Sequence, residues 1–254
     1  MLAIDVGNTN ITTGIFEGNG LKAVFRMPTE VCLNNSAFLP HLPDVRKALP
    51  DAAVMVSVRS GATKIILKEF EESTGLAPMI VDVNTPMGIR LQYDTKETLG
   101  IDRLVCAAAA FHLYRKRRKP LVVIDMGTAT TIDYVTFHGT FIGGMIAPGI
   151  SSAYEGLLAS APQLPRLDDL APGELIGAST NACVRSGVVM GHICMIRKVV
   201  EMMARRNGTK PVVVLTGGPS GMVAEVLPKA YITDEHLMLK GLSHIYSSWI
   251  KKKC

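Results

Sequence analysis

Two stretches of the sequence decide the fold: LAIDVGNTNITTGIF at residues 2–16 and VVIDMGTATTIDYVTF at residues 122–137. Placed one under the other, they share an isoleucine, an aspartate and a glycine at an offset of 120 positions. Each stretch is an apolar run that ends in a glycine turn and leads into a second strand-like run. A fixed offset between two halves of a chain indicates two copies of one supersecondary unit. The matched polar and turn residues are Asp5 with Asp125 and Gly7 with Gly127.

The segments around these hairpins alternate between strand-like and helix-like patterns. A turn at 18–20 leads into a third strand at 21–25, so the chain opens strand–turn–strand–turn–strand. Further strands are predicted at 53–58, 79–83, 89–91, 121–125, 140–146 and 212–216. Helices are predicted at 63–73, 99–114, 177–206 and 236–250. Two more are predicted, one that ends at about 159 and one that begins at 219, and segment 36–49 is expected to be irregular to helical. This alternation predicts an α/β protein with two lobes, 1–117 and 118–254, joined at the basic segment 115–120.

The composition excludes several classes of protein. Of the 254 residues 48% are hydrophobic and 19% charged, which argues against disorder, and the net charge of +5 favours anionic ligands only mildly. No apolar run approaches the roughly 18 residues of a membrane helix, and the N-terminal MLAIDVGN lacks the basic region of a signal peptide. The five cysteines are scattered and never form a CxxC pair, so neither a disulfide framework nor a zinc site is expected. We therefore expect a cytoplasmic protein that does not interact with membranes.

Three predicted strands end in glycine turns that suit phosphate: DVGNTN (5–10), DMGTAT (125–130) and LTGG (215–218). Glycine lets the backbone approach an anion, and the N–H groups of such a turn can point at phosphate oxygens. Further donors are the hydroxyls of Thr9, Thr12, Thr128 and Thr130. The aspartates would instead hold a cation, directly or through water. Any one of these dipeptides alone is more often an ordinary turn, but three at strand ends favour a phosphate site.

The usual nucleotide motifs are absent from the sequence. There is no GxxxxGK[ST], and no GxGxxG follows the first strand, so the P-loop and Rossmann interpretations are excluded. A duplicated pair of hairpins that holds phosphate between two lobes remains as the hypothesis.

A second polar cluster, Gly100-Ile101-Asp102-Arg103, opens a predicted helix and follows Tyr93. An aspartate in this position could accept a proton from a hydroxyl, and an arginine could bind an anionic group with its planar fork. The alternative is that Asp102 only interacts with the helix dipole and that Arg103 is a solvated side chain. For these residues taken alone, that alternative is the more common outcome.

Seven segments, in order along nearly the whole chain, resemble the type III pantothenate kinase family. They are DVGNTNITTGIF (5–16), TPMGIRLQY (85–93), LGIDRLVCAAAA (99–110), IDMGTATTIDYV (124–135), FIGGMIAPGI (141–150), IGASTNACVRSG (176–187) and LTGG (215–218). This family phosphorylates pantothenate with ATP at the first step of coenzyme A synthesis and belongs to the acetate kinase, sugar kinase, Hsp70 and actin superfamily. The resemblance implies a two-lobed, duplicated actin-like (ribonuclease H-like) ATPase fold.

The resemblance also implies roles for individual residues. Asp102 matches the proton acceptor, and Asp125 matches the ligand of a monovalent cation, K⁺ or NH₄⁺. Asp5 would lie near Mg²⁺, through water. The implied ATP-binding residues are Asp5, Val6, Gly7, Asn8, Thr9, Asn10, Ile11, Thr12 and Thr128. The implied pantothenate-binding residues are Tyr93, Gly100, Ile101, Asp102, Arg103 and Thr180.

The chain departs from the family pattern in three places. Thr95-Lys96 stands where members commonly carry Asn-Pro, segment 29–38 lacks an acidic Thr-x-Asp-Glu pattern, and the basic run 115–119 lengthens the link between the lobes. These departures concern the rim of the pantothenate pocket and leave the ATP motifs intact.

Other functions stay open at this point. The chain could be another small-molecule kinase of the same superfamily, or a regulatory or nucleic-acid-binding relative that uses its two basic runs, 115–119 and 251–253. Those runs lack interleaved aromatic residues, so nucleic acid is not expected as a partner. A non-catalytic relative is disfavoured because all three aspartates are present.

A homodimer is predicted from the stretch 188–204, which is apolar on more faces than a one-sided surface helix needs, and from the dimeric habit of the family. The alternative is a central helix that is buried inside its own lobe.

Overall fold

The computed structural model describes residues 1–42 and 52–253, so part of the predicted irregular segment 36–49 lies outside the described residues. Two compact units make up the chain. Unit 1 comprises Met1–Ile89, Asp94–Ala109 and Leu237–Cys254, and unit 2 comprises Arg90–Tyr93 and Ala110–His236. None of the helices within the described ranges is long and apolar enough to cross a membrane.

Unit 1 is built on a five-stranded sheet in the order β3-β2-β1-β4-β5. Its strands are β1 (Leu2–Val6), β2 (Asn10–Glu17), β3 (Gly20–Pro28), β4 (Ala53–Ser57) and β5 (Met79–Ile80). Strands β1, β2 and β3 form an antiparallel meander, while β4 pairs with β1, and β5 with β4, in parallel. The predicted opening of strand–turn–strand–turn–strand is confirmed.

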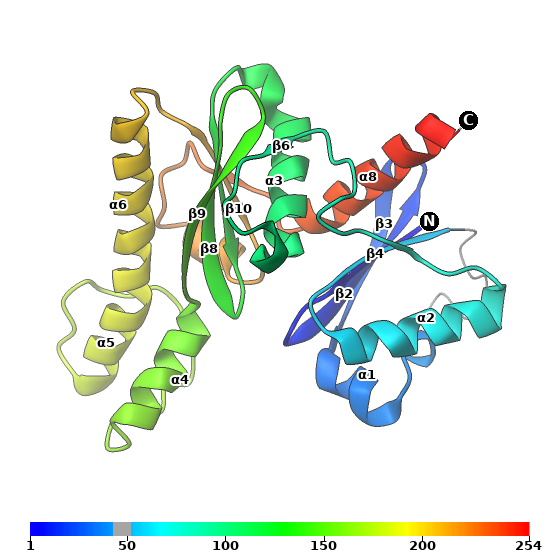
Figure 1. Ribbon diagram of the computed structural model, residues 1–254. Helices are drawn as coiled ribbons and strands as arrows, with labels where there is room; N and C mark the ends of the chain where they lie inside the picture. Colours follow the sequence, from blue (N-terminus) through cyan, green and yellow to red (C-terminus); the bar gives the residue numbers. More distant parts are fainter. Residues whose placement is uncertain (43–51, 254) are drawn as a thin grey trace. The chain divides into compact units, whose positions relative to one another are not determined.

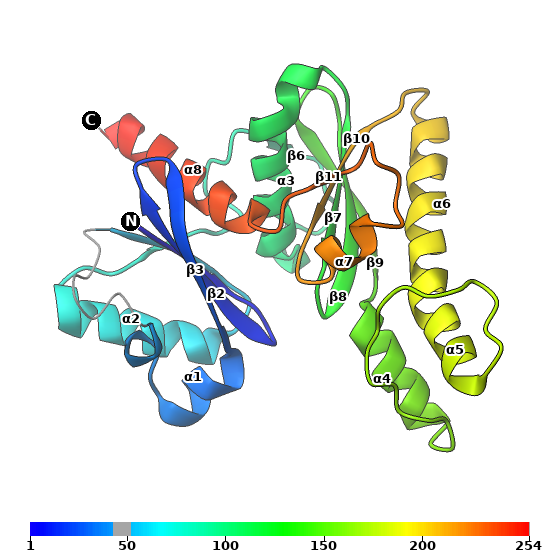
Figure 2. The ribbon, with the colours of Figure 1, turned by 180° about the vertical axis from the view of Figure 1, so that it is seen from behind.

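Helices cover both faces of this sheet. Helices α1 (Thr29–Asn35) and α2 (Ser60–Thr74) lie together on one face, and α8 (Leu237–Lys253) packs on the other (Figures 1 and 2). Because side chains alternate between the two faces of a strand, Leu2, Ile4 and Val6 of β1 all point into one core. Helix α2 packs one apolar face against the same core. Helix α2 ends at Gly75, whose φ of +69° is the left-handed conformation that glycine adopts at helix ends.

Unit 2 is built on a six-stranded sheet in the order β11-β10-β7-β8-β9-β6. Its strands are β6 (Arg90–Leu91), β7 (Leu121–Met126), β8 (Ala129–Val135), β9 (Thr140–Pro148), β10 (Val212–Thr216) and β11 (Ile232–Thr233). The meander β7-β8-β9 is antiparallel, and β10 and β11 continue the sheet in parallel from β7. The order β9-β8-β7-β10-β11 therefore repeats β3-β2-β1-β4-β5, which confirms the predicted duplication and the α/β class.

One long helical rod packs on the sheet of unit 2 (Figure 1). It consists of α5 (Thr180–Arg185), a π-helical turn η4 (Ser186–Met190) and α6 (Gly191–Arg206). A single helix over 177–206 was expected, and the structure differs by this wider turn, which adds a residue to the helix. Helix α4 (Ile150–Ser160) contributes to the same core, and α7 (Ser220–Ala224) follows β10.

The two units do not divide the chain at the basic segment 115–120 that the sequence suggested. Helix α3 (Ile101–Tyr114) passes from unit 1 to unit 2 after Ala109, and the short helix η3 (Arg115–Arg117) follows it. The last helix, α8, belongs to unit 1 because it packs on β1, β2 and β4. Gly14 makes room for it, since a Cβ there would lie 3.0 Å from the side chain of Leu239. The order of the segments in the sequence gives no sign that the last helix packs on the first unit.

Candidate functional site

The predicted phosphate-binding residues 5–12 lie at the end of β1, in the turn that follows and at the start of β2. Val6 and Ile11 are the last register pair, and the N–H of Gly7 donates to the carbonyl of Asn10 at 3.0 Å. Asn8 and Thr9 at the tip are exposed, and Asp5 pairs with Thr12 across the two strands, so their side chains lie on one face. Val6 and Ile11 point into the core, so only their main-chain groups are accessible to a ligand.

The second hairpin repeats this turn with one residue fewer. Met126 and Thr130 are the last pair of β7 and β8, and the N–H of Gly127 donates to the carbonyl of Ala129 at 2.9 Å. Thr128 at the tip is exposed. Asp125 pairs with Thr131, as Asp5 pairs with Thr12 in the first copy. The predicted cation ligand and the predicted ATP contact Thr128 are thus only three positions apart on one hairpin.

The third glycine motif, LTGG, packs against the start of the second hairpin. Strand β10 runs parallel to β7 with Thr216 beside Asp125, and Gly217 follows with a φ of +87°. A Cβ on Gly217 would stand 2.6 Å from Oδ1 of Asp125 and would collide with the carbonyl oxygen of Met126. The fold therefore gathers two of the three predicted glycine turns within unit 2.

Carboxylate and carbonyl oxygens at these turns are the donors that hard cations prefer. A site for Mg²⁺ on a nucleotide needs only one or two protein carboxylates, because phosphates and water supply the other ligands. Asp5 or Asp125 alone satisfies that requirement. Among the described residues no group of three or more histidine, cysteine or acidic side chains could hold a metal, so a protein-only metal cage is not found there.

The cluster around Asp102 forms the first turn of α3. Oδ1 of Asp102 accepts the main-chain N–H of Arg103 at 3.0 Å, and it lies so close to Gly100 that a Cβ there would collide with it. Arg103 is only 6% exposed. The alternative of a solvated arginine is therefore wrong, because its side chain is buried at the foot of the helix.

Tyr93 belongs to unit 2, beside the start of β9 (Thr140–Pro148). Its ring lies 6.1 Å from the ring of Phe141 between centroids, and a Cβ on Gly143 would stand 3.3 Å from it. After it, the hydroxyl of Thr98 donates to Oγ1 of Thr95 at 2.8 Å within the helical turn η2 (Lys96–Thr98). This side-chain hydrogen bond spans Thr95-Lys96, where the sequence departs from the family pattern.

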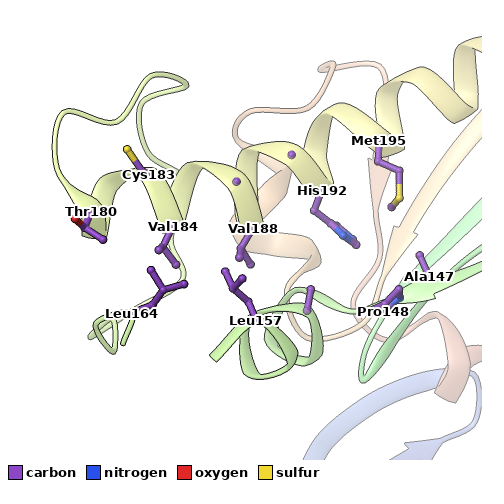
Figure 3. Close-up of a pocket in the computed structure, with 13 residues that line it drawn as sticks. Ala147, Pro148, Leu157, Leu164, Thr180, Cys183, Val184, Val188, His192 and Met195 are labelled. Atoms are coloured by element: carbon purple, nitrogen blue, oxygen red, sulfur yellow. The ribbon is translucent and has the colours of Figure 1, made fainter. Parts of the chain in front are cut away.

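Thr180 lies at the start of α5, on the rim of a pocket of about 630 Å³ in unit 2. Figure 3 shows Val184 and Val188 pointing from the rod toward Leu157 of α4 and Leu164. Apolar side chains therefore line most of this pocket.

His192 is the polar group that sequence reasoning missed, since a lone histidine carries no signal of its environment. It lies on the pocket wall near Pro148 (Figure 3). Its Nε2 is 3.0 Å from Oγ1 of Thr130, a fully buried residue. Burial lowers the pKa of His192 below its ordinary value, because the charged imidazole would lose its hydration.

Comparison with known proteins connects these features to one family. A family model described as type III pantothenate kinase matches residues 1–202. A type III pantothenate kinase of Moorella thermoacetica is 32% identical over 252 residues, which covers 97% of this chain and 98% of that protein. One from Anaeromyxobacter sp. strain K is 33% identical and covers 95% of this chain and 96% of that protein.

Solved structures support the actin-like kinase fold. A Baf family protein from Campylobacter jejuni superimposes with a TM-score of 0.63 at 20% identity, over 99% of this chain and 100% of that chain. A ROK family glucokinase from Streptomyces griseus gives a TM-score of 0.51 at 11% identity, over 97% of this chain and 98% of that chain. At these identities the likeness shows the fold alone.

Proposed function

The chain belongs to the type III pantothenate kinase family, and on that premise we propose that it transfers the γ-phosphoryl group of ATP to the primary hydroxyl of pantothenate. This reaction is the first step of coenzyme A biosynthesis. The observation that carries the proposal is the full-length match to such kinases, together with a duplicated hairpin that ends in a glycine turn in each copy.

The two hairpins are proposed to bind the phosphates of ATP. Among residues 5–12 of unit 1 the turn tip, Asn8 and Thr9, is exposed, as is Thr128 of unit 2. Main-chain N–H groups and hydroxyls at such turns suit an anion, with little covalent chemistry from the protein. Catalysis in such a site is mainly positioning and charge stabilisation.

Asp102 is the proposed proton acceptor for the pantothenate hydroxyl. Its carboxylate is partly exposed, and Oδ1 is held by the Arg103 N–H and lies against Gly100. A carboxylate fixed in this way can orient the hydroxyl for in-line attack and take its proton as the bond to phosphorus forms.

The remaining substrate contacts are proposed by matching positions in the family. Gly100, Ile101 and Arg103 flank Asp102 in the sequence of unit 1, while Tyr93 and Thr180 lie on unit 2. Pantothenate is itself a carboxylate, so the guanidinium of Arg103 is a suitable counter-charge.

Two cations fit the donors present. Asp5 would hold Mg²⁺ through water, and Asp125, with the carbonyl of Met126 close by, would hold K⁺ or NH₄⁺. When bound, they supply positive charge that offsets the negative charge of the phosphates during transfer.

A homodimer is proposed through the helical rod of unit 2. Helix α6 buries Ile193, Ile196 and Val200 in its own unit but leaves Met202 58% exposed, so it is not a central helix buried on every side. Ile176, in the loop before α5, is 87% exposed. Ile176 precedes the start of the rod and Met202 lies near its end, and exposed apolar side chains of this size suit a contact with a second copy.

We place the enzyme in the cytoplasm. The cysteines of the described ranges (Cys32, Cys106, Cys183 and Cys194) are present as thiols, which is the state expected in a reducing compartment.

The test is ADP release by the purified full chain with MgATP and a panel of acceptors. Pantothenate should support turnover, whereas glucose and acetate, the acceptors of related kinases, should leave the rate at background. Repeating the assay with K⁺ and with Na⁺ tests the monovalent cation separately. Turnover with a rival acceptor and none with pantothenate would reassign the chain to another small-molecule kinase.

A further inference from the structure

Thr29, the first residue of α1, forms two hydrogen bonds with the loop of the first hairpin. It is fully buried, whereas Asn8 and Thr9 of the loop are exposed. Its hydroxyl donates to the carbonyl of Gly7 at 2.9 Å, and its main-chain N–H donates to the carbonyl of Thr9 at 2.9 Å. One buried residue thus fixes two of the carbonyl groups of a four-residue turn.

These two hydrogen bonds also fix the direction of two N–H groups. The carbonyl of Gly7 shares a peptide plane with the N–H of Asn8, and the carbonyl of Thr9 shares one with the N–H of Asn10. Both peptide bonds are trans, and in a trans peptide the N–H points away from the C=O. With the carbonyls turned to Thr29, the N–H groups of Asn8 and Asn10 point away from it.

The second copy also has an N–H and a hydroxyl that bond to its turn, but two residues supply them and both bond to the carbonyl of Thr128. Gly149 precedes α4 as Thr29 opens α1, 120 positions earlier, and its N–H donates to the carbonyl of Thr128 at 2.9 Å. A side chain at Gly149 would collide with the carbonyl of Gly127, so no hydroxyl can stand there. Instead the hydroxyl of Ser152, one turn along the helix, donates to the main-chain carbonyl of Thr128 at 2.6 Å.

The replacement follows from loop length. The second turn is one residue shorter, so its carbonyls lie closer to the helix start and leave no space for a threonine side chain. A hydroxyl that bonds a loop carbonyl occurs in both copies, although the residue that carries it moves by three positions.

We propose that Thr29 and Ser152 are positioning residues for nucleotide binding: each hydroxyl holds a hairpin carbonyl so that the next N–H of the turn is presented to the phosphates. The proposal rests on the role of the hairpins in ATP binding given above. Neither hydroxyl is expected to touch the nucleotide itself, since each is engaged on the helix side of its loop.

The test compares Thr29→Val, which removes only the hydroxyl while keeping the branched shape, with Thr29→Ser, which keeps the hydroxyl. Thr13→Val is the matched control, because Thr13 is also buried and lies on β2 outside the loop. The Kd for MgATP is measured by titration calorimetry, and KM values for ATP and pantothenate by ADP release. Ser152→Ala allows the same Kd and KM measurements for unit 2. Because Ser152 is partly exposed, the protein should still fold without its hydroxyl.

Thr29→Val should raise the Kd and KM for ATP about tenfold, the effect of losing one hydrogen bond that orders the site. The KM for pantothenate should stay unchanged, and Thr29→Ser should restore ATP binding. Ser152→Ala should act in the same direction. A Thr29→Val enzyme with a lower melting temperature but wild-type ATP affinity would overturn the proposal and leave Thr29 a structural residue.

Calorimetry separates this proposal from the proposed function. If the wild-type chain binds MgATP but does not phosphorylate pantothenate, the substrate assignment fails and the Kd values still decide the role of the hydroxyls. If Thr29→Val does not fold, the Kd of Ser152→Ala decides, and a wild-type value there refutes the proposal. A wild-type chain that binds no MgATP refutes it as well.

Discussion

Gly217 lies directly against Asp125: a Cβ on the glycine would stand 2.6 Å from Oδ1 of the aspartate. The parallel pairing of β10 with β7 sets this contact, since Thr216 is the register partner of Asp125. The φ of +87° at Gly217 is a second reason for glycine, because L side chains rarely adopt it. The carboxylate and the nearby carbonyl of Met126 thus pack against a turn where only glycine fits.

Asp125→Ala should abolish activation by K⁺ or NH₄⁺, because the carboxylate proposed to hold the ion is removed. ADP release in matched K⁺, NH₄⁺ and Na⁺ buffers measures this. Asp168→Ala, at an exposed aspartate of the same unit, should keep the wild-type response. Wild-type rates that are equal in Na⁺ and K⁺ would remove the monovalent cation from the mechanism.

Asp102→Asn should lower kcat by about 10²- to 10⁴-fold, the range that a general base contributes. The Kd for MgATP should change little, since Asp102 is proposed to act on pantothenate. Asp94→Asn, an exposed aspartate nearby in sequence, is the control. Near-normal turnover of Asp102→Asn would exclude it as the proton acceptor.

Lys96→Ala should raise the KM for pantothenate, with kcat and the KM for ATP little changed. Lys96 is exposed in the turn that follows Tyr93, and its charge would attract the pantothenate carboxylate equally in the ground and transition states. The effect should shrink as salt increases, because exposed charges are screened over about 10 Å at 0.1 M. Lys64→Ala is the control, and an unchanged pantothenate KM at low salt would assign Lys96 to the solvated surface.

His192→Gln should make the stability of the protein less sensitive to acid. The folded pKa of His192 lies below the unfolded value of about 6.5, so the unfolded state binds more protons in acid. The free energy of unfolding therefore falls as the pH drops below about 6.5, and is unaffected by this group well above that value. Urea unfolding at pH 5 and pH 8 measures it; equal losses in wild type and variant would contradict the assignment.

The chain should sediment at about twice its mass of 27.3 kDa at micromolar concentration. Met202→Glu should weaken the dimer, because it would replace the exposed methionine of α6 with a charge. Leu76→Glu, at an exposed leucine of unit 1, should not. A wild-type mass near that of a single chain would refute the dimer.

The sequence by itself determined the duplicated α/β architecture and the positions of the turns. This was possible because strand alternation and glycine at strand ends are local signals, and the offset of 120 positions repeats them. The same signals located Asp5 and Asp125, whereas Asp102 was noted only at a predicted helix start, and the chemical roles of all three came from the family resemblance. The first helix, α1, was missed because segment 29–35 is short and begins after a proline that belongs to β3.

Only the tertiary structure decided which groups support the hairpins. Gly217 meets Asp125, and His192 meets Thr130, through pairing and packing between segments far apart in the chain, which no local pattern encodes. It also decided that a hydroxyl can stand at position 29 but not at position 149. One residue fewer in the second turn brings the carbonyl of Gly127 against the helix start, so the backbone fills the space that a threonine side chain takes in the first copy.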